Sequence, residues 1–93
     1  MKARDITKAL KKKGFKEEQG KNHTKYFLYV NGKKTRIMTV FSRGSNKKEL
    51  SHDLLKRIRK QLKFDDEKLF NDFIKCPMGY SDYVKMLRQK RAI

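Results

Sequence analysis

The sequence predicts an α+β fold in the order α-β-β-β-α, followed by two further helices. Three patterns support this fold class. Apolar residues recur every three to four positions in residues 3–13 and again in residues 54–62, as in amphipathic helices. Residues 24–42 instead alternate around Asn31-Gly32, which is typical of a β-hairpin. Residues 65–93 return to helical spacing.

The N-terminal helix is expected over residues 3–13 and ends before Gly14, since glycine often follows the last helical turn. Its apolar stripe consists of Ala3, Ile6 and Leu10. A weak strand candidate at residues 15–19 comes next. The polar turn Gly20-Lys21-Asn22-His23 separates it from a stronger strand. The sequence therefore places His23 in a turn at the entrance of the hairpin.

The hairpin consists of strands expected at residues 24–31 and 33–42, with Asn31-Gly32 as a type I′ turn. Both of its faces carry apolar side chains, so each face needs a cover, and we expect the helices on either side of it to share one face. Its aromatic residues are able to stack on bases, but in so small a domain they are more often core. They are Tyr26, Phe27, Tyr29 and Phe41.

The next helix carries Leu54, Leu55, Ile58 and Leu62 on one side, and either Asn46 or Ser51 can cap its start. A third helix is expected with Asp65 and Asp66 in its first turn and with Pro77 as its stop. Ser81 is expected to cap a fourth.

The chain is long enough for one domain, with a core at residues 1–64 and a two-helix extension at residues 65–93. The extension has more apolar residues than two short helices can bury between themselves. We therefore expect it to pack on the core or on a partner, including a second copy of the chain in a homo-oligomer.

Positive charge is concentrated before residue 65. The chain has 26 Lys and Arg against 10 Asp and Glu, a net charge of +16. Residues 1–64 carry +15 of this and residues 65–93 only +1. Such an excess favours a polyanionic partner such as RNA. A single cysteine and the lack of a long apolar segment predict a cytoplasmic, soluble protein without a membrane partner.

The residues that we expect to contact RNA lie on and around the helix at residues 54–62, in the segment before this helix, and around the turn before the hairpin. On the helix at residues 54–62 and at its ends they lie opposite the apolar stripe: His52, Lys56, Arg59, Lys60 and Lys63. The others precede this helix: Lys21, Lys25, Arg43, Lys47 and Lys48. The alternative is that these residues form a solvated charged face without a partner, as most runs of charged residues do. The net positive charge of residues 1–64 favours RNA binding.

His23 is the candidate catalytic residue. A side chain beside a strong strand is positioned by the sheet yet reachable, and imidazole groups exchange protons near neutral pH. The alternative is an ordinary exposed turn histidine. No metal site or cofactor is expected, because His23, His52 and Cys76 are scattered and no phosphate-binding glycine motif occurs. Cys76-Pro77 is expected to be a small buried residue and a helix stop.

Three segments together resemble the HicA toxin family. They are Lys13-Gly14-Phe15, Gly20-Lys21-Asn22-His23 and Leu54-Leu55-Lys56-Arg57-Ile58-Arg59-Lys60-Gln61-Leu62, and the resemblance spans residues 3–64. It implies a double-stranded-RNA-binding-like α-β-β-β-α fold with a three-stranded antiparallel sheet. It also implies an mRNA interferase in which His23 corresponds to the histidine of a G-S-H-type turn, although here Lys21 and Asn22 separate Gly20 from His23. A HicB-like antitoxin is the implied protein partner.

The resulting hypothesis is a metal-independent endoribonuclease toxin of a type II toxin–antitoxin system. His23 would take the 2′-hydroxyl proton, and Lys21 or Lys25 would stabilise the charge developing on the phosphate. Two alternatives stay open: a non-catalytic RNA-binding protein, and an interaction protein built around the C-terminal helices.

Overall fold

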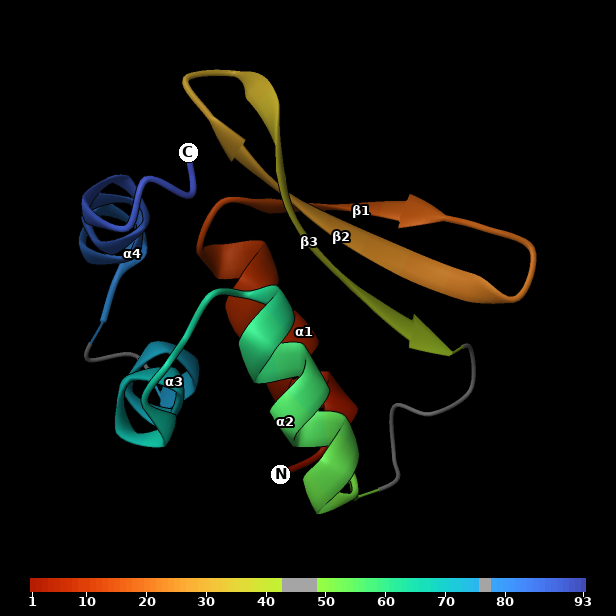
Figure 1. The fold of residues 1–93 in the computed structure, drawn as a ribbon. Coiled ribbons are helices and arrows are strands. Elements are labelled where there is room, and N and C mark those ends of the chain that lie inside the picture. Colours follow the sequence, from red (N-terminus) through yellow and green to blue (C-terminus); the bar gives the residue numbers. More distant parts are fainter. Residues whose placement is uncertain (43–48, 76–77) are drawn as a thin grey trace.

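The computed structural model describes residues 1–42, 49–75 and 78–93 and has the predicted order of elements (Figure 1). The elements are α1 (Ala3–Lys12), β1 (Phe15–Gln19), β2 (His23–Val30), β3 (Lys33–Ser42), α2 (His52–Gln61), α3 (Glu67–Lys75) and α4 (Tyr80–Gln89). This order confirms the α+β class, with a helical extension after an α-β-β-β-α core.

The strands form one antiparallel sheet in the order β1-β2-β3. Asn31 and Gly32 both have positive φ, 53° and 76°, as the predicted turn requires. The pairing of β2 with β3 is irregular between Phe27 and Tyr29, and the Thr35 hydroxyl donates a hydrogen bond to the Leu28 carbonyl there, at 2.8 Å. β2 begins at His23, one residue earlier than predicted, so His23 belongs to the strand rather than to the turn.

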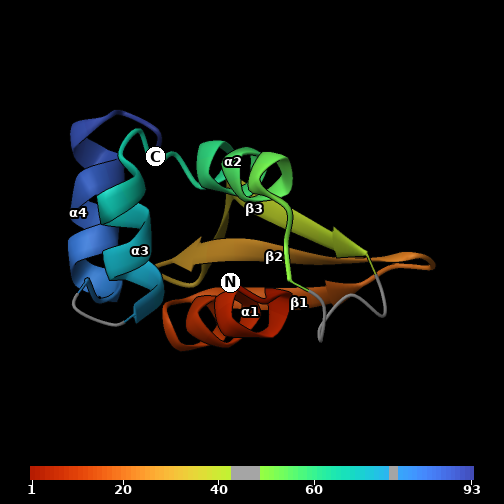
Figure 2. The same ribbon diagram turned by 90° about the horizontal axis from the view of Figure 1, so that it is seen from below.

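α1 and α2 lie side by side on the same face of the sheet, as predicted (Figures 1 and 2). The apolar stripes of both helices face the strands, α1 mainly against β1 and α2 against β3. Burying each such side chain stabilises the fold by about 1.5–3 kcal/mol. The buried residues of this layer are Ala3, Ile6, Leu10, Phe15, Tyr26, Leu28, Ile37, Phe41, Ile58 and Leu62.

The opposite face of the sheet has no helix over it in the part of the chain that the structure describes (Figures 1 and 2). Its apolar side chains, Phe27, Tyr29, Met38 and Val40, are only partly buried. Within the described residues, only the first face therefore has the cover that was expected for both. The buried strand residues all lie on the first face, whereas lysines surround the apolar residues of the second face.

The C-terminal extension packs on the core of its own chain. α3 and α4 lie against each other at one end of the sheet (Figure 2). The Tyr83 ring is 4.6 Å from the Phe73 ring, 5.2 Å from the Phe64 ring and 6.0 Å from the Phe15 ring, measured between centroids. Lys13 is buried and its ammonium donates to the Phe73 carbonyl. The predicted homo-oligomer stays a prediction.

Of the two residues predicted to cap α2, Ser51 occupies the N-cap position. Its hydroxyl accepts a hydrogen bond from the Leu54 amide at 3.2 Å. The other candidate, Asn46, lies outside the described residues. α3 begins at Glu67, so Asp65 and Asp66 precede it rather than forming its first turn.

α4 begins at Tyr80, and the prediction that Ser81 caps it is wrong. Gly79 occupies the cap position, and its amide donates to the Asp82 carboxylate at 3.4 Å. Tyr80 is already helical, so Ser81 lies inside the first turn. The Tyr80 hydroxyl donates a hydrogen bond to the Tyr29 carbonyl at 3.0 Å. Cys76 and the predicted stop at Pro77 lie outside the described residues.

Gly14 permits the contact between α4 and the core, and its replacement tests that contact. Gly14 has φ +91°, and a Cβ atom there would lie 2.4 Å from the Tyr80 ring. We expect Gly14→Ala to lower the free energy of unfolding by about 2–4 kcal/mol, from backbone strain and from displacement of that ring. Urea denaturation measures this loss.

Gly32→Ala is the matched control, since Gly32 also has positive φ, +76°, but no heavy atom within 4 Å of the added Cβ. It should lose only the backbone part, about 1–2 kcal/mol. Equal losses in the two variants would contradict the importance of the Tyr80 contact.

Candidate active site

His23 occupies the first position of β2, where the turn after β1 closes on it. The Gly20 amide donates a hydrogen bond to the His23 carbonyl at 2.8 Å. A Cβ atom at position 20 would lie 2.9 Å from that oxygen, so glycine allows the close approach. Antiparallel pairing with Ser42 fixes the backbone of His23 from the other side, while its side chain is exposed. The backbone of His23 is thus anchored, and its imidazole is accessible.

A cavity of about 230 Å³ opens beside His23, between the outer edge of β3 and α2. α2 contributes Arg57 and Gln61, which are four positions apart and therefore lie on the same side of the helix. The Thr39 hydroxyl donates to Gln61 Oε1 at 2.7 Å, which leaves the amide nitrogen of Gln61 as a donor. A histidine, an arginine and a glutamine thus line one cavity.

The α2 residues that were predicted to bind RNA do not surround this cavity. His52, Lys56 and Arg59 line a smaller cavity of about 50 Å³ against α3. Arg59 Nη1 lies 3.9 Å from Glu67 Oε2, and the buried Nε atom of Arg59 has no hydrogen-bond partner among the described residues. This group faces α3, away from His23.

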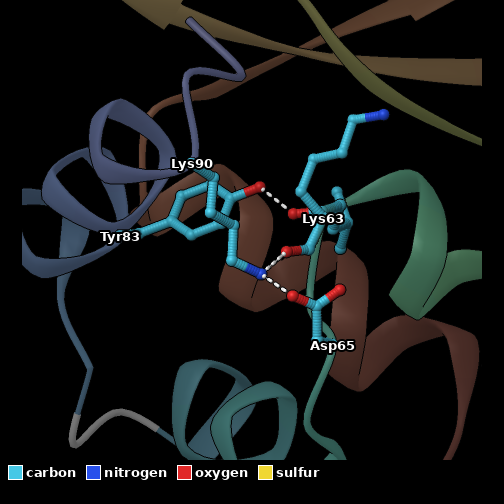
Figure 3. Close-up of polar contacts among 5 residues, drawn as sticks. Lys63, Asp65, Tyr83 and Lys90 are labelled. Atoms are coloured by element: carbon cyan, nitrogen blue, oxygen red, sulfur yellow. Dashed lines mark hydrogen bonds and ion pairs between the residues drawn. The ribbon is translucent and has the colours of Figure 1, made fainter.

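Lys60, near the end of α2, and Lys63, just after it, line a third cavity together with Asp65 and Lys90. The Lys90 ammonium donates to the Lys63 carbonyl at 2.6 Å and to Asp65 Oδ2 at 2.7 Å, whereas the Lys63 side chain points away from these contacts (Figure 3). The hydrogen bond and charge of Lys90 hold the pKa of Asp65 below its ordinary value of 3.8. Asp65 therefore pairs with Lys90, and the Lys63 ammonium extends toward solvent.

The remaining predicted contacts lie along the chain near His23 or beyond the described residues. Lys21 is exposed in the turn before His23. Lys25 is exposed two positions after it, in β2. Arg43, Lys47 and Lys48 lie outside the described residues. The predicted cations thus form separate groups, and the RNA-binding role of each stays a prediction.

Sequence reasoning missed Arg57 and Gln61. It selected helix residues opposite the apolar stripe, whereas these two flank the stripe, next to Ile58 and Leu54. Their four-residue spacing was the one signal in the sequence. That spacing shows that they share a side of α2, but only the packing of α2 against β3 shows that this side meets His23.

Among the residues that the structure describes, no group of three or more His, Cys, Asp or Glu side chains gathers as a metal site would require. Nor is any helix within residues 1–42, 49–75 and 78–93 long and apolar enough to cross a membrane.

The family model for the HicA toxin of bacterial toxin–antitoxin systems matches residues 3–64. The chain belongs to the HicA toxin family. The match includes α1, the three strands and α2, and with them His23, Arg57 and Gln61, whereas α3 and α4 follow it. Comparison with curated proteins and with solved structures gave no match. As a HicA toxin, the protein is the toxin component of a toxin–antitoxin pair and has an antitoxin as its partner.

Proposed function

We propose that this HicA toxin is an endoribonuclease that cleaves mRNA in the cytoplasm without a metal ion, at the cavity beside His23. One observation supports the proposal most directly. His23 from β2 and Arg57 from α2, distant in sequence, line the same cavity of about 230 Å³. A proton acceptor and a positive charge that reach the same phosphate are what cleavage of a phosphodiester requires. A HicB-like protein is the proposed antitoxin.

The proposed reaction uses the hydroxyl group that distinguishes RNA from DNA. His23 takes the proton of a 2′-hydroxyl as its oxygen forms a bond to the adjacent phosphorus. The bond from phosphorus to the 5′ oxygen breaks, and that oxygen takes a proton from a water molecule, whose hydroxide in turn takes the proton held by His23. The products are a 2′,3′-cyclic phosphate and a 5′-hydroxyl end, so atoms and charge balance without a metal ion or a cofactor.

The cations around His23 have distinct parts in this mechanism. The Arg57 guanidinium can donate two parallel hydrogen bonds to a phosphate, which suits it to the non-bridging oxygens. Lys21 and Lys25 flank His23 on its own strand and turn, where they attract the neighbouring phosphates of the chain. Positioning and charge then lower the barrier together.

Cleavage of a defined RNA in the presence of EDTA tests the proposal. We expect products with cyclic phosphate ends, and a rate that falls about 10²–10³-fold in Arg57→Ala, because one charged donor to the reacting phosphate is removed. Arg57→Lys should retain part of the rate, since it keeps the charge but not the paired donors.

Arg88→Ala is the control for net charge, because Arg88 is equally a cation of a helix but lies exposed on α4. Its rate should match that of the unaltered protein. Complete loss of cleavage in EDTA with recovery on adding a divalent cation would contradict the proposal, and salt-sensitive RNA binding without any cleavage would favour a non-catalytic role.

A further inference from the structure

The second face of the sheet is formed by alternate residues of the three strands. In β2, Lys25, Phe27 and Tyr29 occupy every second position and so project from this face, opposite the buried Tyr26 and Leu28. His23, the first residue of the strand, lines the cavity with Arg57. We call the surface made by Lys16, Lys25, Phe27, Tyr29 and Lys34 the open face, and no described helix lies over it (Figure 1). His23 stands at one end of this surface.

The aromatic rings of the open face are paired with lysines rather than packed in the core. Lys34 Nζ lies 3.8 Å from the centroid of the Phe27 ring, and Lys16 Nζ lies 4.5 Å from that of the Tyr29 ring. Because an exposed ammonium group lies over each ring, a flat or charged group from solvent can reach the same ring face. Phe27 and Tyr29 are half-buried, whereas Tyr26 and Phe41 are fully packed beneath the sheet.

The charges of the open face fit a polyanion. Lys16, Lys25 and Lys34 are exposed there, and the strand register places Glu18 next to Lys25. Glu18 forms an ion pair with Lys34 at 2.6 Å. The surface is therefore positively charged on balance, and its aromatic residues lie between the positive charges. Proteins that bind single-stranded nucleic acid combine these two features, with cations along the backbone and rings under the bases.

We propose that the open face binds single-stranded RNA, with Phe27 and Tyr29 stacking on bases and the three lysines contacting phosphates. The proposal rests on the proposed function and adds the class of substrate and the path it follows toward His23. Bases inside a duplex are already stacked and cannot reach the rings, so a single strand is required. Base stacking is stronger than an exposed cation–π contact, and the displaced lysines remain near enough to meet phosphates.

Binding of a fluorescent single-stranded RNA of mixed sequence, followed by anisotropy, tests this. The measurement uses the His23→Ala protein, so that binding is read without cleavage. We expect Phe27→Leu/Tyr29→Leu to weaken binding roughly 10- to 100-fold, since leucine keeps apolar volume in the sheet but has no flat ring. The same RNA annealed to its complement should bind more weakly to the unaltered surface and respond little to this change.

The lysines are tested by the salt dependence of the same binding. Lys16→Gln/Lys34→Gln should reduce the slope of log K against log salt by about 0.7 for each phosphate that the protein no longer neutralises. Phe27→Leu/Tyr29→Leu should leave the slope unchanged, because stacking releases no counterions. Phe27→Tyr, which keeps the ring, should bind as well as the starting protein, and circular dichroism verifies that each variant is folded.

Three outcomes would overturn the proposal: unchanged affinity in Phe27→Leu/Tyr29→Leu, equal binding of single strand and duplex, or loss of antitoxin capture in that variant with RNA binding intact. The last would assign the open face to a protein partner. Failure of the proposed function would give a different result. Single-stranded RNA would still bind through the open face, but the protein with His23 intact would not cleave it. Cleavage that continues in Phe27→Leu/Tyr29→Leu at saturating RNA would leave the role of His23 standing.

Discussion

Replacing His23 by alanine should reduce RNA cleavage about 10²–10⁴-fold, the usual contribution of a positioned acid or base. The fold should be unaffected, because the side chain is exposed and the hydrogen bond with Gly20 uses only the His23 carbonyl. Binding of RNA should stay within a few-fold of the unaltered protein, since the cations that contact phosphates remain. Initial rates on a defined RNA, together with growth arrest on expression, measure the effect.

His52→Ala is the matched control. The chain has 2 histidines, and His52 is also exposed and also begins a regular element, but it lines the cavity against α3 rather than the one with Arg57. At saturating RNA, where a lost RNA contact no longer limits the rate, its cleavage rate should stay within a few-fold of normal. Equal loss of rate in the two variants, or full activity of His23→Ala, would remove His23 from the mechanism.

The largest effect on stability is expected at Tyr83, which joins the extension to the core. Its side chain is fully buried against the rings of Phe64 and Phe73, and its hydroxyl donates to the Leu62 carbonyl at 2.8 Å (Figure 3). We expect Tyr83→Ala to lower the free energy of unfolding by about 3–5 kcal/mol, through the reduced burial and the cavity left behind. Urea denaturation of the whole chain gives the value.

Two companion variants separate the ring from its hydroxyl. Tyr83→Phe keeps the ring but leaves the Leu62 carbonyl without this donor, at a cost of about 1–3 kcal/mol. Lys85→Ala, on the exposed side of the same helix, should change stability by less than about 0.5 kcal/mol. A small loss in Tyr83→Ala would mean that α3 and α4 contribute little to the core.

Tyr83 also carries a pH signature. Burial raises the pKa of its hydroxyl above the ordinary value of 10.0, so the neutral donor form is favoured in the folded protein. A pKa that is higher in the folded state means that this stabilisation is fully present below pH 10 and is lost as the pH rises beyond it. As the pH rises above 10, the free energy of unfolding should therefore fall less in Tyr83→Phe than in the unaltered protein.

The periodicity of side chains was sufficient to predict the elements and their order. The Ala3, Ile6 and Leu10 stripe, the alternation of the hairpin and the Asn31-Gly32 turn all depend on neighbours in the chain, so local geometry alone decides them. Element ends were less predictable. Tyr80 begins α4, ahead of Ser81, and its hydroxyl contacts Tyr29, a residue far away in sequence.

Composition and periodicity therefore established the amphipathic helices and strands and the surplus of positive charge before residue 65, and they placed His23 one residue before the strand that it in fact begins. Three features emerged only from the folded chain: Arg57 lines the same cavity as His23, Tyr83 buries the extension in its own core, and Phe27 and Tyr29 are only half-buried. The difference arises because periodicity shows which residues share a face of one element. Which two faces meet depends on how separate elements pack, and on the burial that their packing gains.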